Sequence, residues 1–230
     1  MQATTEPLPI DAEHWGIPIL DPAMQASRAD LAPHWFAWGS KARRPGAGKG
    51  KTVHFYVSDH HFSALIRRPV GLVAFAPAVA VEPNFSTWPG MPLAEALWWT
   101  YHKRRIAQSW QDAGIPILVD LNVAVEDRYR TLNLLGVPEG WSSYATRHHR
   151  DTGLAALDED FRVAKQHWLK GGLDRSPEFL FVVYGGGVAV RNHCDAGGWV
   201  WVPEQSDVAR GRFVDGANAL PCTETDGTCG

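Results

Sequence analysis

The 230-residue sequence predicts a single α/β domain with a mainly parallel sheet. Segments of strand length alternate with segments of helical periodicity along most of the chain, and the strand-like segments are apolar on both faces. Near-continuous apolar strands are typical of parallel sheets that helices cover on the outside. The handedness rule for the crossovers leaves two arrangements, an open doubly wound sheet and an incomplete TIM-like barrel.

The expected elements follow one another in strict turn after an irregular, Pro-containing N-terminal stretch and a Gly/Lys/Arg loop at residues 40–51. We expect strands at 54–57, 72–81, 117–122, 143–146, 179–184 and 199–202. We expect helices at 62–68, 92–113, 127–135, 157–170 and 188–195. The domain is thus expected to span residues 1–203, and residues 204–230 to form a polar, Gly-rich tail.

The longest expected helix follows Pro92, which suits the first helical turn, and stops at Gly114. Apolar residues recur along it at spacings of three, four and seven, which predicts one buried stripe of Ala96, Trp99, Ile106, Trp110 and Ala113.

A phenol and two guanidiniums are expected on another face of this helix, because Tyr101 lies three residues before Arg104 and four before Arg105. A tyrosine between cations can act as a nucleophile on a phosphodiester, with the arginines holding the phosphate. The alternative is an ordinary outer helix face that keeps its cations in water.

Polar residues follow several expected strands, and in either arrangement ligands bind beyond the carboxyl ends of the strands. The candidates for binding or catalysis there are Asp59, Asn84, Ser86, Asp120, Asn122, Arg147, His148 and Tyr184. Asp59 and Asp120 follow two different strands and could together hold Mg²⁺ or Mn²⁺. The alternatives are that Asp59 caps the next helix and that His148 belongs to a solvated loop.

Composition narrows the class of protein. Eleven tryptophans and nine phenylalanines supply large apolar anchors for a core. The formal charge of −3 argues against a generally basic nucleic-acid coat protein, but basic clusters at 41–51, 102–105 and 147–150 allow local contact with DNA or RNA. We expect a cytoplasmic location and no membrane association, because no apolar run of membrane-spanning length is present and the first residues do not resemble a signal peptide.

Four ordered motifs resemble a known family. They are VHFYVSDHHF at 53–62, EPNFS at 82–86, MPLAEALWWTYHKRRIAQSWQDAGIPIL at 91–118 and FLFVVYGGG at 179–187. Together they resemble the domain of unknown function family DUF4417, whose members are familiar from phages and other mobile elements. The resemblance covers roughly residues 15–203. It implies no established reaction, and this chain has Asn84 and Trp99 where the family usually has Asp and Asn.

Three function hypotheses follow. The first is action on nucleic acid, either binding or metal-assisted phosphodiester chemistry, as the mobile-element resemblance and the basic clusters indicate. The second is a small-molecule enzyme that uses Ser86, Asp120 and Asn122 at the strand ends. The third is a non-catalytic module that binds a host or phage protein, which Asn84 favours because a loop acid is missing there.

Overall fold

The computed structural model describes residues 12–32, 35–39, 45–121, 129, 132–148, 153–172 and 178–209. Seven strands in these residues form one sheet: β1 (Trp35–Ala37), β2 (Thr52–His54), β3 (Val79–Val81), β4 (Ile117–Asp120), β5 (Ser143–Arg147), β6 (Leu180–Tyr184) and β7 (Val200–Val202). All neighbouring strands are parallel, and each pairs with the strand that precedes it in the chain. The predicted α/β class is confirmed.

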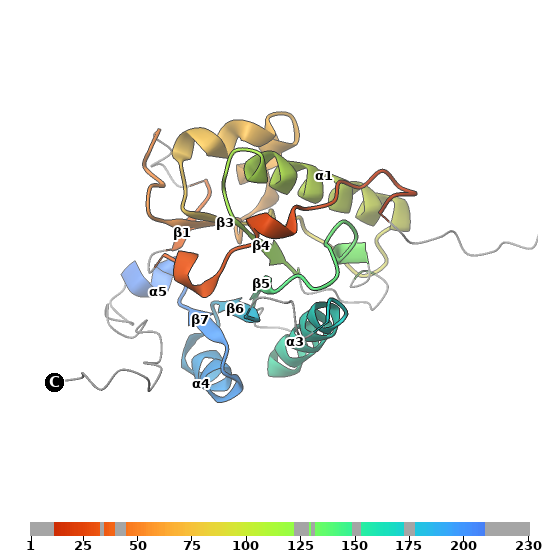
Figure 1. The fold of residues 1–230 in the computed structure, drawn as a ribbon. Helices are drawn as coiled ribbons and strands as arrows, with labels where there is room; N and C mark the ends of the chain where they lie inside the picture. The colour runs from red at the N-terminus through yellow and green to blue at the C-terminus, as the bar shows by residue number, and fades with distance from the viewer. Residues whose placement is uncertain are drawn as a thin grey trace, which may run out of the picture.

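The strand order distinguishes the two arrangements that the sequence left open. A doubly wound sheet reverses its strand order at a switch point, whereas this sheet runs from β1 to β7 without a reversal. Right-handed crossovers in a constant direction place all helices on one face. Figure 1 shows the result, a sheet that curls into an incomplete barrel with helices outside it.

Helices and 3-10 turns cover the outside of the sheet (Figure 1). α1 (Leu93–Gln111) lies with the turns η3 (Asp59–His61), η4 (Ser63–Ile66) and η5 (Pro69–Phe75) on one side. α3 (Gly153–Leu169) and α4 (Gly187–Gly197) lie on the other. The short helix α5 (Gln205–Ala209) contacts β1 at the side where β1 and β7 leave the barrel open. None of the described helices has the length and apolar character needed to cross a bilayer.

The core has two main layers because successive strand residues point to opposite faces of the sheet. The outer layer lies between sheet and helices and includes Val53, Ala80, Val119, Phe181, Ile106, Trp110, Leu157 and Val190. The inner layer fills the barrel and includes Val79, Val81, Leu118, Ala145, Val182 and Tyr184.

An N-terminal segment that includes η1 (Pro22–Met24) and η2 (Arg28–Asp30) closes one end of the barrel. The Ala26 amide donates to the Ile117 carbonyl at 3.0 Å, and the Ser142 amide donates to the Gln25 side chain at 2.8 Å. Ile117 begins β4 and Ser142 precedes β5, so the segment covers the amino ends of the strands, where Figure 1 shows it crossing the sheet. The amino ends of the strands are therefore covered, and ligands of parallel barrels bind at the carboxyl ends.

One expected strand is mostly wrong. Of residues 72–81, the first four belong to the 3-10 turn η5, and only Val79–Val81 form a strand. Ala76 adopts a left-handed conformation with φ of 56°, and Pro77, which lacks an amide donor, follows it. These two residues separate the apolar run into a turn and a short strand.

Smaller differences occur at both ends of the chain. β1 lies between the stretch expected to be irregular, which ends at about His34, and the expected loop at 40–51, where no strand was predicted. The expected helix at 62–68 is the 3-10 helix η4. Residues 205–209, within the expected tail, form α5, while residues 210–230 lie outside the described part of the chain. Of the expected helix at 127–135, residues 129, 132 and 133 are helical and 134–135 form a turn, while 127, 128, 130 and 131 also lie outside the described part. α1, α3, α4 and β4 to β7 agree with the prediction to within a few residues.

Candidate functional site at the carboxyl ends of the strands

A buried cluster of four charged side chains lies where β3 and β4 end. Lys103 Nζ is 2.8 Å from Asp120 Oδ2 and 4.0 Å from Glu82 Oε2, and Arg104 pairs with the other oxygen of Glu82. The Asp120 amide also donates to Glu82 Oε2 at 3.2 Å. All four side chains are at most 3% exposed. Two cations thus neutralise two carboxylates, which is the condition for burying them.

Arg104 has further partners inside the protein. Its Nε donates to the Leu135 carbonyl at 2.8 Å, and its Nη2 donates to the Asn133 carbonyl. Tyr101 and Arg105 are only half-buried, and Arg105 donates to the Ile66 carbonyl. The expected face of Tyr101, Arg104 and Arg105 is therefore divided, because Arg104 turns into the core and cannot hold a ligand phosphate together with Arg105.

Lys103 and Glu82 were not among the residues predicted from the sequence. Lys103 lies seven residues after Ala96 and three before Ile106, so it falls on the apolar stripe of α1. A lysine on that stripe must find an acid inside the protein. Glu82 directly follows the apolar strand β3 and supplies one.

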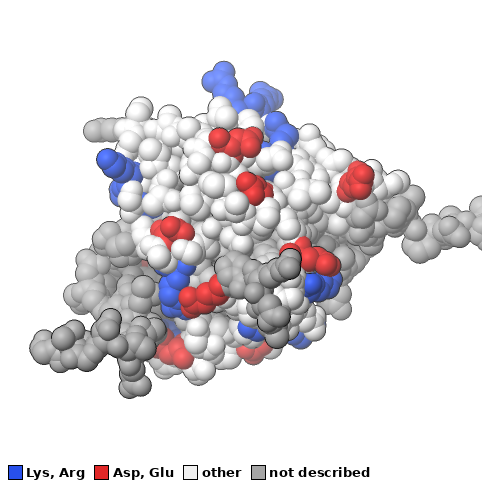
Figure 2. Space-filling model, in the orientation of Figure 1, with Lys and Arg blue, Asp and Glu red and all other residues white. Residues whose placement is uncertain are grey.

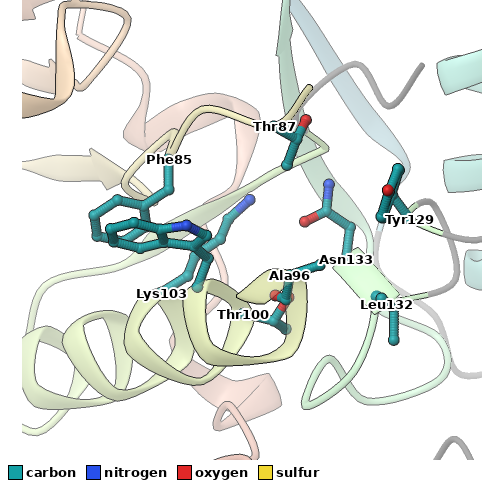
Figure 3. A pocket seen from close by; sticks show the side chains of 9 residues that line it. Phe85, Thr87, Ala96, Thr100, Lys103, Tyr129, Leu132 and Asn133 are labelled. Carbon is teal, nitrogen blue, oxygen red and sulfur yellow. The ribbon is translucent and has the colours of Figure 1, made fainter. Parts of the chain in front are cut away.

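A small cavity adjoins the charged cluster and is shown in Figure 3. Its lining residues are Phe85, Thr87, Ala96, Trp99, Thr100, Lys103, Tyr129, Leu132 and Asn133. The free space is about 20 Å³, enough for about one water molecule. In Figure 3 the Lys103 amine lies between the side chains of Phe85 and Asn133. A water molecule in this cavity can contact the amine, but the cavity is too small for a substrate.

Asp59 holds the loop that follows β3. Its two carboxylate oxygens accept hydrogen bonds from the Ser86 amide at 3.0 Å and the Ser86 hydroxyl at 3.1 Å. The carboxylate thus binds a loop 27 residues away instead of capping the next turn. Asn84 in the same loop is half-buried. Among the described residues, no group of three His, Cys, Asp or Glu side chains could hold a metal ion, so an Asp59–Asp120 metal site remains a prediction.

Aromatic rings from β1, β2 and β6 contact one another inside the barrel. The ring of Tyr184 on β6 lies 4.3 Å from that of His54 on β2, and it stacks on Trp35 of β1 at 6.1 Å. Tyr56, just beyond β2, stacks on Tyr184 at 5.2 Å. The Tyr184 hydroxyl accepts from the Gln205 amide at 3.2 Å and so reaches α5.

Arg147 enters the same interior from β5. Its Nη1 donates to the Tyr56 carbonyl at 3.5 Å. Burial, and then the charge of Arg147, lowers the pKa of His54 to about 3, so this imidazole is neutral at pH 7. Burial, followed by the nearby Asp120 carboxylate, raises the pKa of Tyr56 well above its ordinary value. The structure therefore brings the predicted residues Asp120, Arg147 and Tyr184 to one region.

Comparison with known proteins identifies the family. The family described as domain of unknown function (DUF4417) matches residues 10–170. The chain belongs to this family. It is 32% identical over 155 residues to the Gene 1 protein of Mycobacterium phage D29, which covers 65% of this chain and 54% of that protein. It is 28% identical over 170 residues to the Gene 1 protein of Mycobacterium phage L5, which covers 72% of this chain and 70% of that one.

The chain therefore spans only about half the length of the D29 protein. No solved structure matches this DUF4417 protein. The expected resemblance to a family of phage proteins is confirmed.

The two departures from the DUF4417 pattern have structural places. Trp99 stacks on Phe85 at 4.7 Å beside the small cavity, and Asn84 precedes Phe85 in the loop that Asp59 holds.

His148 is half-buried beyond β5, where its amide donates to the Tyr184 carbonyl at 3.0 Å. Burial lowers the pKa of this imidazole, and the nearby Glu204 opposes that shift. Asn122 lies outside the described residues.

Proposed function

We propose that this DUF4417 protein binds single-stranded nucleic acid on the outer surface of α1. The observation that carries the proposal is a row of aromatic and cationic side chains, named here the α1 strip: Trp98, His102, Arg105, Arg67 and Arg68. The strip differs from the face predicted from the sequence, because Trp98 and His102 replace Tyr101 and the buried Arg104.

Contacts make the α1 strip continuous. Trp98, His102 and Arg105 lie at spacings of four and three and so share one helix face. The rings of Trp98 and His102 are 4.3 Å apart, and Arg105 contributes with burial to lowering the pKa of His102. Arg105 donates to the carbonyl of Ile66, the last residue of η4. The next two residues along the chain are the exposed Arg67 and Arg68.

The chemistry of the strip suits an unpaired strand. The Trp98 side chain is 46% exposed, and an exposed indole can stack on a base of any sequence. Arginines bind phosphate oxygens with paired N–H donors. Figure 2 shows Lys and Arg side chains projecting at the upper edge of the molecule, which α1 and the turns before β3 occupy in Figure 1. The names of the phage relatives state no activity, so the proposal depends on the strip alone.

The test is a fluorescence anisotropy titration with labelled single-stranded DNA, single-stranded RNA and duplex DNA at two salt concentrations. We expect Trp98→Ala to weaken single-strand binding about 5- to 150-fold, the range for the loss of one stacked base. We expect Arg67→Ala/Arg68→Ala to reduce the salt dependence by about 1.4 in log–log slope, if each arginine contacts one phosphate.

The matched control is Arg162→Ala/Lys170→Ala, which removes two exposed charges at α3, on the other side of the barrel. Equal losses in this control, or no binding at micromolar protein, would contradict the proposal. Loss of binding to a protein ligand in Trp98→Ala alone would instead favour the third hypothesis, a partner-binding module.

The same titration with Mg²⁺ or Mn²⁺ tests the predicted phosphodiester chemistry. Asp59 and Asp120 are the predicted metal ligands, and Tyr101, Ser86 and Asp120 the predicted catalytic groups. Cleavage that stops in Asp59→Asn would support that chemistry. Intact oligonucleotides in both metals would limit the function to binding.

A further inference from the structure

We propose that Arg147 and His54 form a binding site for a phosphate group inside the carboxyl end of the barrel. This site is separate from the α1 strip and does not depend on the proposed function. It is argued from the hydrogen-bonding state of two buried nitrogen atoms.

His54 presents a buried donor with nothing to donate to. The Tyr56 amide donates to His54 Nδ1 at 3.3 Å, so Nδ1 is the unprotonated nitrogen of the neutral ring. The ring hydrogen is therefore on Nε2. That atom is buried and has no hydrogen-bond partner among the described residues, and His54 as a whole is 1% exposed. Buried side-chain donors in proteins nearly always have an acceptor, so this one indicates a bound species.

Arg147 presents a half-buried cation without a carboxylate. Within the described residues, its guanidinium makes one long contact, from Nη1 to the Tyr56 carbonyl at 3.5 Å, and no ion pair. Its Nε is buried, and the part of the chain that the structure describes supplies no acceptor for it. The contrast with Lys103 and Arg104 is direct, because both of those cations are paired with carboxylates.

The two residues face one interior region. Arg147 pairs in register with Tyr184, whose ring lies 4.3 Å from that of His54, and the charge of Arg147 acts on the imidazole. Both residues end their strands, at the open end of the barrel, where ligands of parallel barrels bind. Two carboxylates also act on Tyr56 in this region: Asp120 is paired with Lys103, and Asp160 accepts a hydrogen bond from the Thr146 hydroxyl at 2.8 Å. Neither carboxylate pairs with Arg147 among the described residues, so this cation is available to attract an anion.

The donors favour phosphate over a carboxylate. The fork of a guanidinium binds two oxygens of one group, and a third oxygen lets that group also accept from His54 Nε2 without sharing an oxygen with the fork. A carboxylate has only two oxygens, whereas a terminal phosphate has three. The proposed ligand class is thus a phosphate monoester, either of a small molecule or of a nucleotide.

The test follows the imidazole NMR signals of the wild-type protein during titration with inorganic phosphate. We expect the His54 Nε2 proton to shift and saturate, and 5′-nucleoside monophosphate to compete with phosphate. We expect Arg147→Met to weaken phosphate binding at least tenfold and His54→Phe to weaken it severalfold. The control Arg191→Met, on α4, should leave it within twofold.

Several results would overturn the site. They are an unshifted His54 signal in saturating phosphate, equal affinity in Arg147→Met, or equal losses in Arg191→Met. A sugar phosphate that competes as well as the nucleotide identifies a small-molecule ligand, while preference for the nucleotide identifies a nucleotide source. Failure here leaves single-strand binding by the α1 strip unaffected, because Trp98 and Arg147 are tested with different ligands.

Discussion

Replacement of Arg104 by methionine tests how far the fold depends on its buried charges. Arg104→Met keeps an unbranched side chain in the core but removes the cation from Glu82, which is 0% exposed. It also removes the donors to the Leu135 and Asn133 carbonyls. Among the described residues, the Glu82 carboxylate then keeps the Asp120 amide as a donor and Lys103, at 4.0 Å, as its nearest cation, and Lys103 is already paired with Asp120.

The expected loss is large. Breaking a buried ion pair by removing one partner costs about 3–5 kcal/mol. Domains are stable by about 5–15 kcal/mol, so Arg104→Met should remove at least about a fifth of the total. For a chain of this size each kcal/mol lowers the melting temperature by about 2–4 °C, which predicts a decrease of roughly 6–20 °C.

Urea denaturation of a double-mutant cycle measures the effect. The cycle compares wild type, Arg104→Met, Glu82→Gln and the double variant, because Glu82→Gln removes the charge that Arg104→Met leaves unpaired. We expect the double variant to be more stable than the sum of the single losses implies. Arg162→Met is the control, since it breaks an exposed pair with Glu159 and should cost at most about 1 kcal/mol. A loss below 1 kcal/mol in Arg104→Met, or additive effects, would refute the reasoning.

Three further predictions concern pH, a glycine and a loop. The folded-state pKa of His54 is lowered to about 3, so the unfolded chain binds more protons between about pH 6.5 and 3, and stability falls as pH falls through that window. His54→Phe should reduce the slope of unfolding free energy against pH there by up to about 1.4 kcal/mol per unit. Gly136→Ala should destabilise the fold by several kcal/mol, because φ is +78° and the new methyl would meet a backbone carbonyl. Gly114→Ala, with φ of +82° and open space around the new methyl, should cost only about 1–2 kcal/mol. Differential scanning calorimetry of both variants measures the difference. Asp59→Ala should accelerate hydrogen exchange of the Ser86 amide roughly tenfold, since it removes that amide's acceptor.

Each of these three has a contradicting result. An unchanged acid slope in His54→Phe would show that this histidine does not resist protonation. Equal melting temperatures for the two glycine variants would show that the carbonyl contact at position 136 can relax. Unchanged exchange at Ser86 would show that the loop keeps its shape without the carboxylate.

The sequence was sufficient to predict the order and type of most large elements. α1, α3 and α4 have clear helical periodicity, and β6 is an apolar run with a glycine turn directly after it. The choice between barrel and open sheet was not accessible, because it depends on which strands pair. Strands that are apolar on both faces look alike in both arrangements. The run at 72–81 was misread because a buried 3-10 turn and a buried strand share the same apolar composition.

The candidate site was predictable only in part. The rule for carboxyl ends selected Asp120, Arg147 and Tyr184, which the structure places in one region. Helical spacing did not predict which arginine of α1 is buried: Arg104 and Arg105 are adjacent, yet Arg104 is buried and Arg105 is half-buried. A difference of 100° around a helix decides between an ion pair in the core and a surface contact. The partner within reach of each cation determines that outcome: Arg105 donates to the Ile66 carbonyl, and Arg104 pairs with Glu82, which is 22 residues away in the chain.

The segment that covers the amino ends of the strands sets an order of events during synthesis. Gln25 leaves the ribosome long before Ser142, its hydrogen-bond partner 117 residues later. This N-terminal segment cannot pack against the barrel until β4 and β5 have been synthesised. Its apolar side chains therefore stay exposed until then. Closing so long a loop is slow, and apolar surface that stays exposed meanwhile promotes aggregation with other partly folded chains. We therefore expect a nascent chain that stops before Ser142 to bind chaperones. A chain that extends just beyond β5 can begin to bury its N-terminal segment.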